Sequence, residues 1–155
     1  MINYKSAEEI SLLKKSNQLV AKALAEAGRY IEEGITTIEI DTIIDSFIRA
    51  NNAIPAFKGY NGFPNSACIS VNEAVVHGIP GEYKLKDGDI VSVDVGVVLN
   101  DYFGDSAYTF KVGNVSQEVC DLLDATKTSL YKGIEQAVIG NRLGDIGFAI
   151  QNYIE

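Results

Sequence analysis

Two aspartates lie in adjacent stretches that alternate as β-strands do, "VSVDVGVVLN" and "DYFGDSAYTF". In the first stretch Asp94 falls on the face opposite the apolar one, which is made of Val91, Val93, Val95 and Val97. An antiparallel hairpin whose loop centres on Leu99-Asn100 would set Asp94 directly opposite Asp105. A slip of two residues would leave the two acids diagonal neighbours on one face, whereas an odd-length loop would separate them.

Two carboxylates that face each other across a sheet repel, so this arrangement needs a partner. A shared proton, a cationic side chain or a metal ion could supply it. The hairpin contains no Lys or Arg before Lys111, and Gly96 and Gly104 leave room beside the acids. We therefore expect a divalent metal site, since such ions prefer oxygen ligands. The alternative is that both acids lie on a solvated face without a specific role.

His77 is the only histidine of the chain, and it lies within "SVNEAVVHGIP". Gly78 and Pro80 predict a sharp turn directly after it, which would present the imidazole from the end of a strand. Histidine can exchange protons near neutral pH or hydrogen-bond a reacting amide. The alternative is an ordinary structural or surface histidine.

The elements that must position these residues follow from capping signals and periodicity. Ser6 and Thr36 each precede a Glu by three residues, which predicts capping boxes at the starts of two amphipathic helices. The first is expected to end at Gly34 and the second near residues 51–52. After these two helices we expect a Gly- and Pro-rich loop, a short strand around residues 68–71 and the hairpin. Two more helices should follow, over about 116–138 and 143–154. This order predicts an α+β class with a largely antiparallel sheet.

Composition limits the function further. The 155 residues are 46% hydrophobic and 22% charged, which is typical of one soluble globular domain. The net charge of −8 argues against a nucleic-acid surface. No apolar run has membrane-spanning length, the N-terminus lacks a signal-type core, and two cysteines do not form a disulfide framework. We therefore expect no membrane contact and a cytoplasmic protein with reduced thiols.

Two segments, "NGFPNSACISVNEAVVHGIP" and "LKDGDIVSVDVGVVLNDYFGDSAYTFKVG", resemble the type I methionine aminopeptidases, and the similarity runs over essentially the whole chain. The resemblance implies a pita-bread fold, in which two α–β halves are related by a pseudo-twofold axis. Residues 1–155 would form the N-terminal half of that catalytic domain, an antiparallel sheet with helices on one face. The C-terminal half would be missing from this chain.

The resemblance also implies a site with two divalent metal ions, Co, Mn, Fe or Zn, held by two Asp, one His and two Glu. Asp94 and Asp105 match the two aspartates, and Asp105 would bridge the ions. His77 matches the histidine that contacts the scissile amide and not the one that binds metal. The other ligands are expected after "AIQNYIE" and do not occur in the sequence.

Three further residues, Tyr60, Phe63 and Cys68, fall where the family builds its methionine pocket. A thioether packs well against aromatic rings and a small soft side chain, so this assignment is chemically reasonable. Simple core packing is the alternative for all three. Phe57 stands where some relatives have Cys, which affects the shape expected for the pocket.

The function implied is removal of the initiator methionine, by attack of a metal-bridging hydroxide on the first peptide bond. The substrates would be peptides and nascent polypeptides that begin with methionine, the latter met close to the ribosome. One alternative is a truncated, non-catalytic half-domain that needs a complementary chain or acts only in binding. Another keeps the fold with proline-directed substrates, but the S-x-N-E-x-x-x-H-G-I-P segment and Cys68 argue against it.

Overall fold

The first helix, α1 (Ala7–Gly28), begins where its capping box predicts. In the computed structural model, which describes residues 3–155, the Ser6 hydroxyl accepts from the Glu9 amide at 3.2 Å and the Glu9 carboxylate accepts from the Ser6 amide at 2.7 Å. The expectation that this helix runs to Gly34 is wrong. The chain turns after Gly28, and the Gly34 amide donates to the Leu85 carbonyl at 2.8 Å, so pairing with a distant segment replaces further helical bonds.

The second helix, α2 (Thr37–Ala50), also begins at its predicted capping box, formed by Thr36 and Glu39. One face of α2 carries three isoleucines at helical spacing. They are fully buried: Ile40, Ile44 and Ile48. This stripe anchors the helix to the core, as its periodicity predicts.

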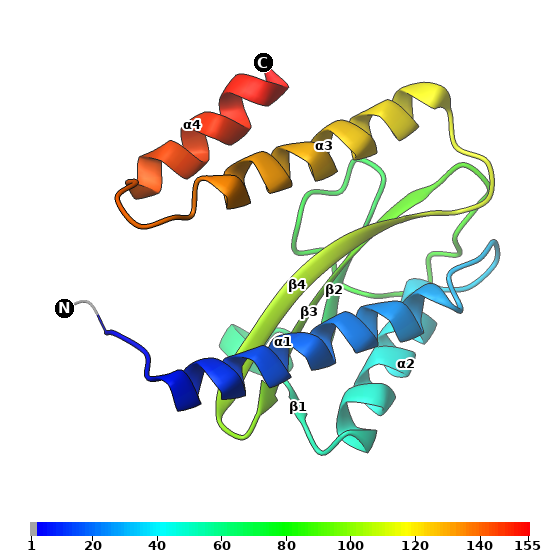
Figure 1. Cartoon of the computed structure of the whole chain (residues 1–155). Coiled ribbons are helices and arrows are strands. Elements are labelled where there is room, and N and C mark those ends of the chain that lie inside the picture. Colours follow the sequence, from blue (N-terminus) through cyan, green and yellow to red (C-terminus); the bar gives the residue numbers. More distant parts are fainter. Residues whose placement is uncertain (1–2) are drawn as a thin grey trace. The chain divides into compact units, whose positions relative to one another are not determined.

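The sheet is antiparallel throughout and is organised around β3 (Ile90–Leu99). Strand β4 (Tyr102–Lys111) pairs with one edge of β3. Along the other edge run first β1 (Ile54–Pro55) and then β2 (Ala67–Val71) (Figure 1). A 3-10 helix, Tyr60–Gly62, lies in the loop between β1 and β2.

One face of this sheet packs against α1 and α2 and forms the core. The four valines predicted to share a face of β3 are completely buried there. Val20, Ala23 and Ala27 of α1 join them, together with the isoleucines of α2. The α+β class with helices on one face of an antiparallel sheet is confirmed, and the acids of the hairpin therefore lie on the other face of β3 and β4.

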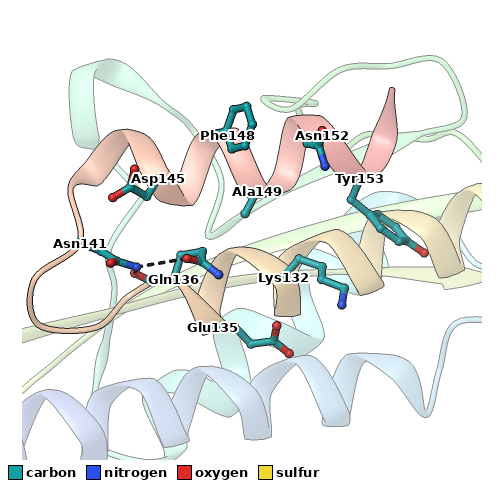
Figure 2. A pocket seen from close by; sticks show the side chains of 9 residues that line it. All are labelled: Lys132, Glu135, Gln136, Asn141, Asp145, Phe148, Ala149, Asn152 and Tyr153. Carbon is teal, nitrogen blue, oxygen red and sulfur yellow. Dashed lines mark hydrogen bonds between the residues drawn. The ribbon is translucent and has the colours of Figure 1, made fainter.

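Residues Val115–Glu155 form a second compact unit, separate from the one that ends at Asn114. It consists of α3 (Gln117–Glu135) and α4 (Leu143–Ile154), close to the predicted helices. Gly133 admits the Ile150 side chain between them, since a Cβ there would lie 2.8 Å from Ile150 Cδ1. A groove of about 730 Å³ lies between the two helices. Figure 2 shows the side chains that line it, among which Asn141 donates a hydrogen bond to Gln136. Among the described residues 3–155, none of the helices combines the length with the apolar character that a membrane span requires.

Candidate active site

The register of the β3–β4 hairpin decides how its two acids meet. Asp94 lies opposite Ala107, and Asp105 lies opposite Gly96, so the expectation that the acids face each other directly is wrong. The turn is formed by Asn100 and Asp101, with φ of 52° and 65°. Positive φ at both positions defines a type I′ turn, and Asn and Asp tolerate it better than leucine does. The acids are therefore diagonal neighbours on one face, as the two-residue slip predicts.

One oxygen of the Asp94 carboxylate lacks a hydrogen-bond partner among the described residues 3–155. This atom, Oδ1, is buried. Burial, and next the neighbouring Asp105 carboxylate, raise the pKa of Asp94, while the charge of His77 opposes the shift. A cation bound between the two acids would relieve both the desolvation and the repulsion.

The two glycines beside the acids do not leave open space, contrary to expectation. Gly96 lies on the acid-bearing face, where a Cβ would come 2.5 Å from Cε1 of the Phe57 ring. Gly104 lies on the opposite face, where a Cβ would come 2.5 Å from the Ser16 carbonyl carbon of α1. Each glycine thus admits another part of the protein, an aromatic ring in one case and a helix backbone in the other.

Two polar residues of α1 hold the hairpin, and their role was not predicted. The Ser16 hydroxyl donates to the Tyr102 carbonyl at 2.9 Å, next to the turn. The Asn17 side-chain oxygen accepts from the Asp105 amide at 3.3 Å. The signal for this contact is present in the sequence, because Asn17 interrupts the apolar stripe of its helix. The acid-bearing strand is therefore positioned from the core side.

His77 lies in the sharp turn that the following residues predict. Its neighbour Val76 has φ of 55°, and the Gly78 amide donates to the Val76 carbonyl at 2.7 Å. The hydroxyl of Ser70 contacts the same turn: it donates to the Val76 carbonyl and accepts from the Gly78 amide. The His77 side chain is exposed, and its charge acts on Asp94. The turn thus brings His77 within electrostatic range of Asp94.

Of the three predicted pocket residues, Cys68 lies nearest to the acids in register. It pairs with Asp94 across β2 and β3, so the two side chains share a face. Burial, then Asp94 and Asp105, raise the pKa of the Cys68 thiol. Tyr60 is 71% exposed in the loop before β2, which excludes core packing for this residue, and Phe63 follows it half-buried.

The residues present fit part of a metal site. The buried, unpartnered oxygen of Asp94 beside a second carboxylate is an arrangement that a hard cation would stabilise. Within residues 3–155, however, no group of three or more His, Cys, Asp or Glu side chains is placed to hold a metal ion. The hairpin therefore offers two ligand side chains and not a complete set.

Comparison with known proteins gives a consistent result. The chain is 50% identical over 155 residues to methionine aminopeptidase 1 of Bacillus subtilis, a match that covers 100% of this chain and 62% of the relative. The crystal structure of methionine aminopeptidase from Rickettsia prowazekii superposes with a TM-score of 0.97 at 38% identity, over 99% of this chain and 62% of that one.

A prolidase from Pyrococcus horikoshii superposes with a TM-score of 0.86 at 21% identity, over 97% of this chain and 42% of that one, which shows the shared fold alone. The chain spans about 62% of the length of the curated relatives that it matches. Residues 11–155 match metallopeptidase family M24. The chain therefore belongs to metallopeptidase family M24.

Proposed function

We propose that this chain forms part of a methionine aminopeptidase and supplies Asp94 and Asp105 as ligands of its divalent metal ions. The observation that carries the proposal is the buried Asp94 Oδ1, which has no hydrogen-bond partner within residues 3–155 and lies beside a second carboxylate. Similarity to proteins named methionine aminopeptidase, at 50% identity for the Bacillus subtilis relative, supports the choice of reaction.

Each residue of the site has a separate task in this proposal. The site would hold two divalent ions of Co, Mn, Fe or Zn. As Lewis acids, they would activate water and polarise the scissile carbonyl. Asp94 and Asp105 would hold these ions on the sheet and neutralise part of their charge. His77 hydrogen-bonds the scissile amide and assists departure of the new amine. The other ligands would come from a complementary segment, since the described residues hold only two acids at this place.

The substrate in this proposal is the N-terminal methionine of peptides and nascent polypeptides in the cytoplasm. Cys68 lies on the acid-bearing face, and Tyr60 and Phe63 lie in the loop that leads to its strand. These side chains would surround the thioether of a methionine with aromatic rings and a sulfur atom. Such surroundings favour methionine over polar side chains. Tyr60 is exposed enough to contact a peptide directly.

The test is release of methionine from the peptide Met-Ala-Ser by the natural protein, assayed with Mn²⁺, Co²⁺, Fe²⁺ or Zn²⁺. Asp94→Asn keeps the size of the side chain but halves the negative charge of the pair, and we expect kcat/KM to fall at least about 100-fold. The matched control is Asp101→Asn at the exposed tip of the same hairpin, where Asn suits the positive φ. Unchanged turnover or metal content in Asp94→Asn would refute the ligand assignment.

A further inference from the structure

One buried hydroxyl holds the turn that carries His77 from both sides. Ser70 lies in β2 and is only 3% exposed. Its Oγ donates to the carbonyl of Val76, the residue before His77, and accepts at 3.1 Å from the amide of Gly78, the residue after it. A single side chain thus satisfies one backbone group on each side of the histidine.

The backbone at this turn is in a conformation that needs such support. The Gly78 amide also donates to the Val76 carbonyl at 2.7 Å, which closes a γ-turn with His77 at its centre. Val76 has φ of 55°, and a β-branched residue rarely adopts the left-handed region. Conformations of this kind persist only where their surroundings hold them, and they gather at functional sites.

The turn is also tied to the edge of β2. The Ile69 amide donates to the Gly78 carbonyl at 2.9 Å, and a Cβ at Gly78 would collide with the Ile69 carbonyl oxygen. Ile69 directly precedes Ser70, so two consecutive residues of β2 hold the same turn. Cys68, one residue further back, lies opposite Asp94. The strand that faces the acids therefore also sets the position of His77.

We infer that Ser70 is a positioning residue for His77: it holds the γ-turn so that the imidazole stays beside the acid-bearing face of β3. The inference deepens the proposed function and rests on the role assigned there to His77. Ser70 need not touch a substrate, because it acts through the backbone on both sides of the histidine. The opposing view is that its hydroxyl only satisfies the backbone groups of Val76 and Gly78 and stabilises the fold.

The first test is a double-mutant cycle of Ser70→Ala and His77→Ala on methionine release by the natural protein. We expect Ser70→Ala alone to lower kcat about 10-fold with little change in KM, since orientation of a catalytic group affects turnover more than binding. In the His77→Ala background, Ser70→Ala should cause no further loss. A loss of the same size in both backgrounds would overturn the inference.

The second test does not depend on activity. His77 is the only histidine of the 155 residues, so its ring signals in a proton–carbon NMR spectrum of this chain need no assignment. We expect Ser70→Ala to shift or broaden them and to speed hydrogen exchange of the Gly78 amide about 10-fold. If Ser70→Ala does not fold, Ser70→Cys, with a weaker donor of similar size, should shift or broaden the ring signals relative to those of the wild type.

Ser92→Ala is the matched control. Ser92 lies directly opposite Ser70 on β3, but its hydroxyl bonds to Thr109 at 2.8 Å and not to the turn. The control should leave turnover and ring signals unchanged. Failure of the proposed function is a separate outcome: in a protein that releases no methionine, the ring spectrum alone decides. If Ser70→Ala changes the His77 ring signals no more than Ser92→Ala does, the inference is overturned.

Discussion

Asp41 of α2 holds the start of the strand that faces the site, and its loss should be costly. The side chain is 4% exposed. Its Oδ1 accepts from the backbone amides of Ser66 at 2.9 Å and Ala67 at 2.8 Å, and its Oδ2 accepts from the Asn65 side chain at 2.9 Å. One carboxylate thus joins α2 to the beginning of β2, close to Cys68.

The magnitude follows from the groups that Asp41→Ala would leave without a partner. Ser66 and Ala67 are both completely buried, so water cannot replace the lost acceptor in the folded chain. A buried unsatisfied amide costs about 1–3 kcal/mol, and two of them predict a loss of about 4 kcal/mol in the free energy of unfolding. The total free energy of unfolding of a typical domain is only about 5–15 kcal/mol.

The assay is urea unfolding followed by circular dichroism, together with hydrogen exchange at the Ser66 and Ala67 amides. Asp41→Asn keeps one oxygen toward these amides and should lose less than half as much stability as Asp41→Ala. Asp124→Ala, the same change at an exposed position of α3, should stay within about 0.5 kcal/mol of the wild type. A loss below about 1 kcal/mol in Asp41→Ala would refute the reasoning.

Two further outcomes are expected. Gly104→Ala should destabilise the chain by about 1–3 kcal/mol, because the new methyl group meets α1 backbone, whereas Gly81→Ala, with no atom within 4 Å of its Cβ, should be nearly neutral in the same urea titration. The Arg49 guanidinium holds the pKa of Asp45 at about 2, below its ordinary 3.8. The stabilisation from Asp45, about 1 kcal/mol after solvent screening, is present above pH 3.8 and lost as pH falls toward 2, so Asp45→Asn and wild type should converge there. A constant difference in unfolding free energy from pH 2 to pH 5 would contradict that assignment.

Local signals in the sequence were sufficient for the starts of the first two helices and for the core face of β3. Both helix starts were predicted because a capping box joins residues only three positions apart. The valine face of β3 was predicted because side chains alternate along any strand. For an even-length loop, which the two-residue turn at Asn100-Asp101 supplies, the same alternation places Asp94 and Asp105 on one face.

The tertiary structure decided what depends on segments far apart in the chain. The end of α1 is set by bonds to residue 85, and the space at Gly96 and Gly104 is filled by Phe57 and by α1, which no local pattern reveals. The turn at Asn100-Asp101 sets the diagonal register of the acids, and Ser70 holds the turn of His77. Alternation and capping act within a few residues and can be read from the sequence. Register, packing and the support of a strained turn come from contacts that only the folded chain brings together.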